Sequence, residues 1–526
     1  MPRDDVAAPE APPPSSAARR FAGAPLSRWA VPVALSLLVL VSLWLRTRAL
    51  GLHYWIDEGL SVGIAGHPVG QILSILRQDG SPPLYYLLLH FWMAWRGTGE
   101  AATHELSLVF ALLIIPAAYW AGAGLFSRRA GLVSAVLAAG APYLTTYGQE
   151  TRMYSLLALL ALVVAASFVH AFVRRDRRYL PVFVVSLTAS LYTHNWALFL
   201  GLMTAVAFLV CVRELPQERP ALWRDGAIAF GSVAVLFAPW VPSVLYQAAH
   251  TGAPWALPPV IWSLTQAGYS LVGGRGAAVA LALGAGVGLL ALRGAPDVRT
   301  RRLLLGAGCL LILGVGTLLT AWAYAKITPA WAIRYFAVIA GPLIVLFGLG
   351  IARAGRLGLV VLALTASFWV LDPVASNLSS KSNVASAVAK VRPDLRPGTL
   401  VLSTQPEQVP TLAYYLPRGS HFGSTLGPVL DPRFVDWRDA LRRLRRTSVQ
   451  TVLMPMIGSL APGQRLLLVV PTNLPSSPLW MKIINRAGRQ WAKALGNDHS
   501  LRRLATTSVH SASAGLAVRI TVYVRS

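Results

Sequence analysis

Charged side chains are scarce in this sequence. Only 13% of its 526 residues are Asp, Glu, Lys or Arg, whereas a soluble domain usually has about 25%. Hydrophobic residues make up 55% of the chain and gather in long runs, which are typical of membrane-spanning helices. The composition therefore excludes an ordinary soluble protein and predicts one whose surroundings are a lipid bilayer.

Acidic residues are the scarcer of the two charge types. Lys and Arg number 47 against 21 Asp and Glu, which gives a net charge of +26. In a soluble protein this excess would suggest nucleic acid, but here the Arg clusters lie beside the apolar runs. Orientation in the bilayer and contact with anionic lipid headgroups account for such clusters. We therefore expect no nucleic-acid partner.

Cysteine is almost absent. Cys211 and Cys309 are the only two, and both lie inside apolar runs. This excludes a disulfide framework, although part of the chain is expected to face an oxidising compartment.

The first 28 residues are rich in Pro, Ala and Ser and predict a disordered cytoplasmic tail. The tail is long for the polar start of a signal peptide, and no small-x-small cleavage site follows the apolar run after it. Residues 29–50 are therefore predicted to be the first spanning helix of a membrane domain that extends over 29–371.

The apolar runs predict a membrane domain of about eleven helices. These lie at 29–50, 104–126, 131–147, 153–173, 180–194, 195–212, 225–245, 275–293, 303–325, 333–351 and 356–371. Arg-rich loops alternate with Arg-poor loops, as a cytoplasmic N-terminus requires. The run 82–96 would break this alternation if it spanned, and it is short and rich in Tyr and Trp. We expect it to be an interfacial or re-entrant helix within a first exoplasmic loop, 51–103.

Residues 372–526 have a different character. Strand-like stretches at 399–403, 450–456, 465–470 and 516–524 alternate with helix-like segments around 434–446 and 480–494. This pattern predicts a small exoplasmic α/β domain. The domain is basic, which fits either an anionic neighbour or a solvated face beside lipid headgroups.

Two adjacent carboxylates, Asp57 and Glu58, follow the first predicted span and are flanked by Tyr54 and Trp55. Carboxylates beside hydrocarbon lose hydration, which raises their pKa and suits a base that accepts a proton from a hydroxyl group. A solvated pair or a helix N-cap is the alternative interpretation.

Three further clusters fall on the same predicted side of the bilayer. They are Tyr147–Tyr154, which contains Gln149, Glu150 and Arg152; Tyr192–Trp196, which contains His194; and Lys326–Tyr335, which contains Arg334. Cations placed against the orientation rule favour a bound phosphate. Helix-dipole compensation by Glu150, a solvated His194 and snorkelling of Lys326 and Arg334 are the alternatives.

Four segments in this order resemble the GT-C glycosyltransferases, and specifically glycosyltransferase family 39, the protein-mannosyltransferase and aminoarabinose-transferase-like group. They are Trp55-Ile56-Asp57-Glu58, Ser81–Tyr86 (Ser-Pro-Pro-Leu-Tyr-Tyr), Ser127–Gly131 and Tyr147–Tyr154. The resemblance covers about 29–370 and is strongest over the first 200 residues. No known acceptor-binding module is recognised in the C-terminal domain.

This resemblance implies a fold, a reaction and a set of site residues. Such enzymes take a sugar from a polyprenyl-phosphate carrier at the exoplasmic face and invert its anomeric centre. Asp57 matches their catalytic base and Asp57-Glu58 their Asp-Glu motif. Gln149, Glu150, Arg152 and Tyr154 match part of the active-site wall, and Arg334-Tyr335 resembles the Arg-Tyr near the carrier phosphate. Lys326 and His194 are expected to assist at the phosphate.

Several alternatives stay open at this level. Mannose is the first expectation for the sugar and a pentose such as arabinose the second, and the acceptor is a glycan, a lipid or a protein. No cofactor is predicted with certainty, but Asp57, Glu58 and Glu150 would gather a divalent metal if the fold brought them close. The Ala-, Arg- and Gly-rich composition suggests the cell membrane of a bacterium.

Other protein classes are disfavoured. A transporter or flippase for a lipid-linked sugar would be expected to show internal repeats and sites near mid-membrane. A non-catalytic assembly factor would have no need of the acidic pair. A sugar-nucleotide donor lacks a Gly-rich phosphate loop after a strand in the short cytoplasmic loops.

Overall fold

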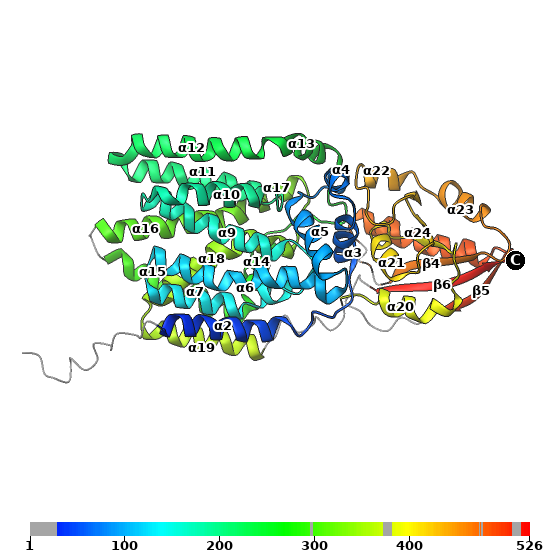
Figure 1. Cartoon of the computed structure of the whole chain (residues 1–526), viewed down its shortest axis with the longest axis horizontal. Helices are drawn as coiled ribbons and strands as arrows, with labels where there is room; N and C mark the ends of the chain where they lie inside the picture. Colours follow the sequence, from blue (N-terminus) through cyan, green and yellow to red (C-terminus); the bar gives the residue numbers. More distant parts are fainter. Residues whose placement is uncertain (1–28, 295–297, 372–380, 473, 475–476, 508–516) are drawn as a thin grey trace, which may run out of the picture.

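We describe the protein from a computed structural model, which covers residues 29–294, 298–371, 381–472, 474, 477–507 and 517–526. A helical bundle carries the C-terminal domain at one end, and three short helices lie between the two (Figure 1). The predicted N-terminal tail lies outside the described residues.

The bundle begins with α2 and ends with α19. Its helices are α2 (Ala30–Arg46), α6 (Glu100–Leu125), α7 (Arg128–Gly140), α8 (Pro142–Tyr147), α9 (Tyr154–Phe168), α10 (Leu180–Leu191), α11 (Ala197–Glu214), α12 (Arg219–Phe237), α13 (Val241–His250), α14 (Trp262–Val272), α15 (Arg275–Leu290), α16 (Val298–Leu311), α17 (Thr317–Ile327), α18 (Ala337–Arg353) and α19 (Arg356–Leu371). Short π-helical turns, η1 (Val169–Val173) and η6 (Ile312–Gly316), continue α9 and α16, and the 3₁₀ turn η7 (Ile333–Phe336) precedes α18. Each of the eleven apolar segments is thus helical.

Within the described residues, six helices are long and apolar enough to cross a membrane, or seven if one bent pair is counted. That pair is α14 and α15, which meet at 88°. Gly273 and Gly274 allow the bend because both have positive φ angles, of 85° and 120°. The chain is therefore a multi-pass membrane protein, and the count of eleven crossings stays a prediction.

Two predicted spans differ in detail from the observed helices. The segment 131–147 divides into α7 and α8 because Pro142, at the first position of α8, has no N–H to continue the earlier helix. The first helix ends at Arg46, four residues before the predicted end at 50. Arg46 is fully buried and donates to the carbonyl oxygens of Ala111 (2.6 Å) and Ala138 (2.7 Å), which ties α2 to α6 and α7.

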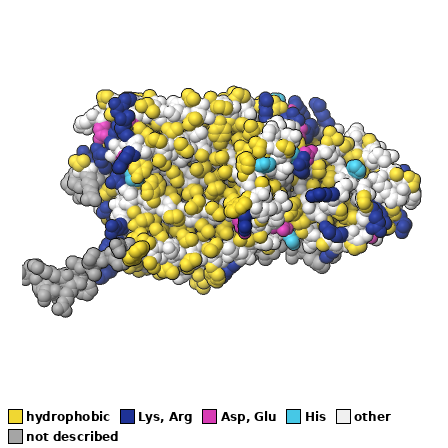
Figure 2. Space-filling model, in the orientation of Figure 1, with side chains coloured by type: hydrophobic (Ala, Val, Ile, Leu, Met, Phe, Trp, Pro, Cys, Tyr) yellow, Lys and Arg dark blue, Asp and Glu magenta, His cyan; other side chains and the backbone are white. Residues whose placement is uncertain are grey.

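The end of the bundle farthest from the C-terminal domain gathers basic side chains, whereas its flank is apolar (Figure 2). Here Asp225 is fully buried and pairs with Arg175 (3.0 Å) and Arg177 (3.1 Å). Glu218 joins Arg175 (2.8 Å) to Arg302 (2.6 Å). Arg175 and Arg177 before α10, Glu218 before α12 and Arg302 in α16 therefore meet in one ion-pair network.

The predicted first exoplasmic loop folds into three helices between the bundle and the C-terminal domain (Figure 1). They are α3 (Ile56–Ala65), α4 (Val69–Asp79) and α5 (Leu84–Arg96). The run 82–96 thus forms a short helix, α5, which packs against α3 and α6.

The C-terminal domain is built on a six-stranded sheet of order β3-β2-β1-β4-β6-β5. Its strands are β1 (Leu400–Ser403), β2 (His421–Ser424), β3 (Gly427–Val429), β4 (Arg465–Thr472), β5 (Leu501–Thr506) and β6 (Ala517–Arg525). β2, β1 and β4 are parallel, whereas β3, β6 and β5 pair antiparallel. The predicted fold class, a helical membrane protein with a C-terminal α/β domain, is confirmed.

Helices cover both faces of this sheet because its strands alternate two sets of apolar side chains. Val401 and Leu467 pack with α20 (Val384–Val391) and α21 (Val409–Tyr415). Leu402 and Leu468 pack on the other side with α23 (Met454–Gly458) and α24 (Leu479–Gly496). Each face of the sheet therefore has its own hydrophobic core, and the strands are buried on both faces.

One expectation for this domain was wrong, and a second was right only in part. The segment 450–456 is helical rather than a strand, because Ser448 accepts from Thr451 N (3.2 Å) as an N-cap and Pro455 lacks the N–H that a central strand requires. The helix expected at 434–446 is shortened to α22 (Ala440–Arg445). It begins after Asp439, which has a φ of 49° and whose N–H donates to His250 O (2.7 Å).

The C-terminal domain docks closely on the first-loop helices. His67 in the turn after α3 lies 2.7 Å from the Asp431 carboxylate, and Trp437 N donates to Gln78 O at 3.1 Å. A Cβ atom on Gly63 would collide with the carbonyl oxygen of Arg433. Glycine on α3 therefore permits the close approach of the two backbones.

We expect Gly63→Ala to weaken this docking by about 1–3 kcal/mol, because a methyl group would overpack the interface. Thermal unfolding in detergent should show a lower melting temperature, and limited proteolysis should release the C-terminal domain faster. Gly70→Ala on α4 is the matched control, since a Cβ atom there meets nothing within 4 Å. Equal melting temperatures for the two variants would contradict the close approach.

Candidate active site

Asp57 and Glu58 lie in the first turn of α3. The helix begins after the extended residue Trp55, whose N–H is directed at Glu58 Oε2 (3.4 Å). Neighbouring residues on a helix point about 100° apart, so the two carboxylates face different surroundings. The helix N-terminus favours both negative charges.

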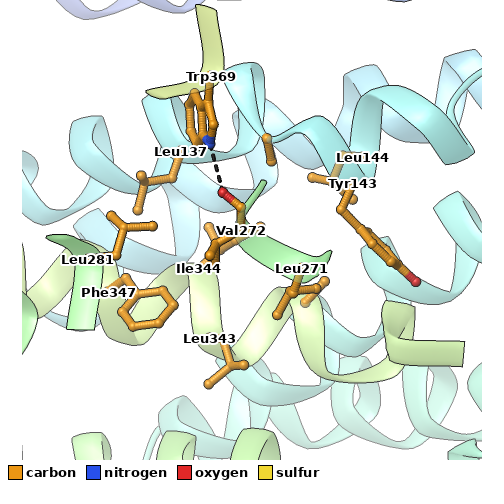
Figure 3. Close-up of a pocket in the computed structure, with 12 residues that line it drawn as sticks. Leu137, Tyr143, Leu144, Leu271, Val272, Leu281, Leu343, Ile344, Phe347 and Trp369 are labelled. Carbon is orange, nitrogen blue, oxygen red and sulfur yellow. Dashed lines mark hydrogen bonds between the residues drawn. The ribbon is translucent and has the colours of Figure 1, made fainter. Parts of the chain in front are cut away.

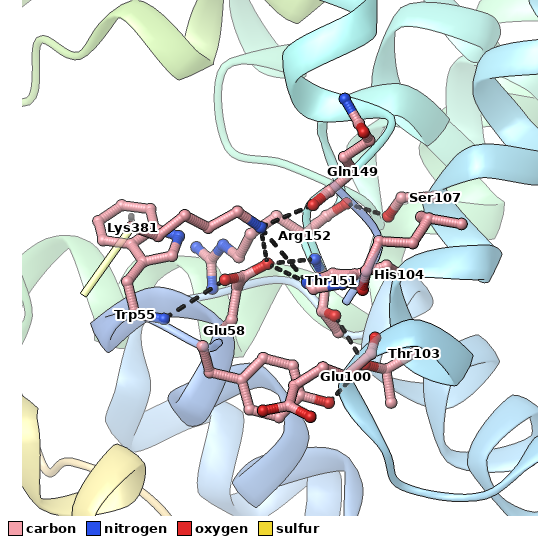
Figure 4. Close-up of polar contacts among 12 residues, drawn as sticks. Trp55, Glu58, Glu100, Thr103, His104, Ser107, Gln149, Thr151, Arg152 and Lys381 are labelled. Carbon is pink, nitrogen blue, oxygen red and sulfur yellow. Dashed lines mark hydrogen bonds and ion pairs between the residues drawn. The ribbon is translucent and has the colours of Figure 1, made fainter. Parts of the chain in front are cut away.

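Glu58 points inward and is fully buried (Figure 4). Its Oε1 atom lies 2.8 Å from Lys381 Nζ and 2.6 Å from His104 Nε2, and it accepts from Thr151 N at 3.0 Å. Burial raises the pKa of Glu58, but the Lys381 ammonium and His104 outweigh it and lower the pKa to about 2. Glu58 is therefore a carboxylate at neutral pH and is held rigidly.

Lys381 brings the C-terminal domain into this network. It lies just before α20, is 7% exposed, and also donates to Gln149 O at 2.6 Å. One ammonium group thus contacts both the Asp57-Glu58 helix and the Gln149–Tyr154 segment (Figure 4).

Asp57 faces two arginines. Its Oδ2 atom lies 3.3 Å from Arg334 Nε and 4.0 Å from Arg152 Nε. Among the described residues these three atoms have no hydrogen-bond partner, because the ion pairs lack hydrogen-bond geometry. The carboxylate and both guanidinium groups therefore keep hydrogen-bonding capacity for another molecule.

Arg152 is held from several sides. Its Nη1 atom donates to Asp57 O (3.2 Å) and to Ser61 Oγ (3.0 Å), while Nη2 donates to the Tyr154 hydroxyl (3.4 Å). Nη1 also lies 3.5 Å from the Tyr86 hydroxyl. These contacts leave Nε as the part of the guanidinium group that faces the side-chain carboxylate of Asp57.

Aromatic rings surround Arg334. Its guanidinium carbon lies 4.7 Å from the Trp255 ring centroid and 5.7 Å from that of Trp55. The Tyr335 ring in turn contacts His194, with centroids 4.7 Å apart, and Tyr154, with centroids 6.3 Å apart. The rings, which we call the aromatic wall, hold the Arg334 cation in place by cation–π attraction.

Glu150 is buried close to this cluster, with 7% exposure and no hydrogen-bond partner on Oε2. Burial raises its pKa to about 8, assisted by the charges of Glu58 and Asp57 and opposed by Lys381 and Arg334. Glu150 is thus mainly a neutral carboxylic acid at pH 7.

The fold brings together most of the residues singled out from the sequence. Those that lie in or near the Asp57 region or its aromatic wall are Glu58, Glu150, Arg152, Tyr154, His194, Arg334 and Tyr335. Lys326 is different: it is exposed, its ammonium lies 5.0 Å from the Trp322 ring, and it forms no ion pair among the described residues.

Sequence reasoning missed His104, Lys381 and Asp79. Asp79 is buried at the end of α4, and burial raises its pKa to about 6, against a hydrogen bond from Ser81 and the charge of Arg152. Its position two residues before the Ser81–Tyr86 segment was the one available signal. No sequence signal marks His104 or Lys381, because their partner Glu58 lies 46 and 323 residues away from them in the chain.

The carboxylates do not form a metal-binding group. No cluster of three His, Cys, Asp or Glu side chains suited to a metal ion occurs in the described ranges. Arg334 lies beside Asp57 and Lys381 beside Glu58, so positively charged side chains already offset both carboxylate charges.

No protein-family model and no curated protein sequence matches the chain. Solved structures do. ArnT from Cupriavidus metallidurans superimposes with a TM-score of 0.65 at 14% identity, over 94% of this chain and 97% of ArnT. The same protein bound to undecaprenyl phosphate gives 0.61 at 13% identity, over 94% and 98%.

A second similar structure is the archaeal oligosaccharyltransferase AglB from Archaeoglobus fulgidus, in complex with an inhibitory peptide and a dolichol-phosphate. Its TM-score is 0.51 at 12% identity, over 75% of this chain and 65% of AglB. These proteins are GT-C glycosyltransferases. The predicted GT-C fold is therefore confirmed, while membership of family 39 stays a prediction.

We expect Lys381→Met to destabilise the protein by about 3–5 kcal/mol, because it leaves the buried Glu58 charge without its ammonium partner. The double variant Glu58→Gln/Lys381→Met should lose less than the sum of the two single changes, and thermal unfolding in detergent measures this coupling. Lys390→Met, at an exposed position of α20, is the control. Strict additivity would contradict the ion pair.

Proposed function

We propose that the protein is a glycosyltransferase that moves a sugar from a polyprenyl-phosphate carrier to an acceptor hydroxyl group at the exoplasmic face of the membrane. The observation that carries the proposal is the Asp57 carboxylate held between Arg152 and Arg334, with hydrogen-bonding capacity left on all three. A base beside two cations suits a reaction that removes a proton and releases a phosphate.

In this mechanism Asp57 takes the proton of the acceptor hydroxyl group, and the acceptor oxygen forms a bond to the anomeric carbon. The bond from that carbon to the phosphate oxygen breaks, and its electron pair leaves with the polyprenyl phosphate. Arg334 stabilises the phosphate charge, with Arg152 and His194 nearby. Attack opposite the leaving group inverts the anomeric centre. Glu58 positions α3 rather than reacting, because Lys381, His104 and Thr151 occupy its oxygen.

An apolar pocket gives the carrier a place for its hydrocarbon chain. Its walls come from α7, α8, α14, α15, α18 and α19, and the lining includes Leu271, Leu281, Phe347 and Trp369 (Figure 3). Tyr143 lines the pocket and donates to Arg334 O at 2.7 Å. A hydrocarbon chain bound in the pocket would therefore place the phosphate of the carrier toward Arg334. ArnT, which has the same fold, has been solved bound to undecaprenyl phosphate, and this supports a polyprenyl phosphate as the class of ligand.

The finer parts of the proposal rest on charge and resemblance. The ion-pair network of Arg175, Glu218 and Asp225 favours a cytoplasmic face at the opposite end of the bundle. This orientation makes the N-terminus cytoplasmic and the C-terminal domain exoplasmic. The Ala-, Arg- and Gly-rich composition supports a bacterial cell membrane as the location. The motif order favours family 39, with mannose as the first sugar to test and arabinose the second.

We expect Asp57→Asn to lower sugar transfer by about 10²–10⁴-fold, because the amide cannot accept the hydroxyl proton. The assay is transfer of radiolabelled sugar from polyprenyl-phosphate donors in membranes, at equal protein level. Glu105→Gln, on an exposed ion pair with Arg96, is the control and should keep full activity. Full transfer by Asp57→Asn would refute the assigned base. Movement of lipid-linked sugar across the bilayer without transfer would indicate a flippase instead.

Activity should also fall as the pH rises through about 8. Below that pH the buried Glu150 is protonated; above it, a third negative charge appears beside Asp57 and Glu58 and repels the phosphate. Glu150→Gln keeps a neutral side chain at every pH, so its pH–rate profile should lack this high-pH decline. An unchanged decline in the variant would assign it to another group.

A further inference from the structure

Buried polar atoms without hydrogen-bond partners concentrate at one place in the C-terminal domain. Seventeen such side-chain atoms occur among the described residues of the chain, and five belong to the segment Thr404–Gln408. They are Thr404 Oγ1, Gln405 Oε1, Glu407 Oε2, Gln408 Oε1 and Gln408 Nε2. All four side chains are at most 5% exposed, and the described part of the C-terminal domain has no other such atom.

The sheet topology explains why this segment is suited to a ligand. It follows directly from the carboxyl end of β1, and β1 lies between two parallel neighbours, β2 and β4. The connection after β1 leads to β2 on one side, and the chain later returns to β4 on the other. In open α/β sheets this is the switch point beside which ligands bind.

The same segment lies against the helix that carries Asp57. The turn η10 (Pro406–Gln408) and α21 pack on α3, where Thr411 Oγ1 donates to Trp55 O at 3.4 Å. A Cβ atom on Gly59 would collide with Thr411. Burial raises the pKa of Glu407, and the charge of Asp57 raises it further. A molecule bound by Thr404–Gln408 would therefore lie at the contact between η10 and α3, which we call the seam. Asp57, the proposed catalytic base, is on α3.

The chemistry of the segment is that of a site for neutral hydroxyl groups. Gln408 offers an NH2 group that donates and a carbonyl oxygen that accepts, Gln405 and Glu407 offer acceptors, and Thr404 offers a hydroxyl group. Glu407 also accepts from Trp480 Nε1 (3.1 Å), and the Trp480 and Trp437 rings lie 5.5 Å apart. A sugar, whose hydroxyl groups each donate and accept, can satisfy several of these atoms at once, whereas one serine hydroxyl group cannot.

We propose that Thr404, Gln405, Glu407 and Gln408 form an acceptor subsite that binds the hydroxyl groups of a neutral saccharide and presents one of them to Asp57. The inference rests on the proposed function and names its acceptor class. Because the five atoms are enclosed, the saccharide reaches them when the seam between η10 and α3 widens.

Gln408→Leu tests the subsite, because leucine has a similar size and removes both unpaired atoms. The assay uses full-length protein, a polyprenyl-phosphate-linked sugar, and neutral octyl glycosides (glucoside, galactoside, mannoside and arabinoside) as acceptors. We expect the KM for the accepted glycoside to rise about tenfold or more, since two hydrogen bonds are lost. The KM for the donor should stay unchanged.

Thermal unfolding provides the second measurement. Replacing a buried group that lacks partners by an apolar one should leave the melting temperature unchanged or higher. Gln450→Leu, at an exposed position of the turn after α22, is the control and should change neither value. A lower melting temperature with an unchanged glycoside KM would show that Gln408 is only structural and would overturn the proposal.

Failure of this inference is distinguishable from failure of the proposed function. Wild-type transfer to a serine-containing peptide, with no transfer to any glycoside, would overturn the saccharide subsite and leave the glycosyltransferase intact. An unchanged glycoside KM in an active Gln408→Leu variant would do the same. No transfer from any donor to any acceptor by wild-type protein would overturn both.

Discussion

The ion pair between Glu58 and Lys381 is the constraint on which the rest of this structure depends. A carboxylate taken out of water is very costly unless partners compensate its charge, and here the compensating ammonium belongs to a residue 323 positions later in the sequence. Burial of Glu58 as a carboxylate therefore depends on the docking of the C-terminal domain on the bundle. Docking then fixes α3, and with it the direction of Asp57.

Two neighbouring carboxylates acquire opposite properties because one helical turn points them at different surroundings. Glu58 faces donors that occupy its oxygen, which makes it part of the frame. Asp57 faces Arg152 and Arg334 at distances of 4.0 and 3.3 Å that leave hydrogen bonds unmade. Unmade bonds in a buried place are destabilising, and proteins tolerate them where a ligand supplies the missing partners.

The two domains contribute complementary halves of the same region. The bundle supplies cations, aromatic rings and an apolar pocket, which suit a lipid phosphate. The sheet of the C-terminal domain directs the carboxyl ends of β1 and β4 toward the first-loop helices, where the buried side chains of Thr404, Gln405, Glu407 and Gln408 gather. A lipid-linked donor comes from the membrane and an acceptor comes from water. The two substrates therefore need binding surfaces of different character, one in the bundle and one in the C-terminal domain.

The sequence by itself determined that this is a multi-pass helical protein with an α/β domain, because apolar runs and alternating patterns depend on local composition. It also singled out Asp57, Arg152 and Arg334, since charged residues beside apolar runs stand out. Segment 450–456 was misread because a short apolar run fits a strand or a buried helix equally well, and the cap at Ser448 decided between them.

Only the tertiary structure decided which residues meet. Lys381 and His104 have ordinary sequence surroundings, yet both lie on Glu58, whereas Lys326 stood out in the sequence and lies on Trp322 instead. The polar segment Thr404–Gln408 reads as a loop until β1 and α3 enclose it. Contacts between residues hundreds of positions apart follow from packing and charge compensation, and no local pattern encodes them.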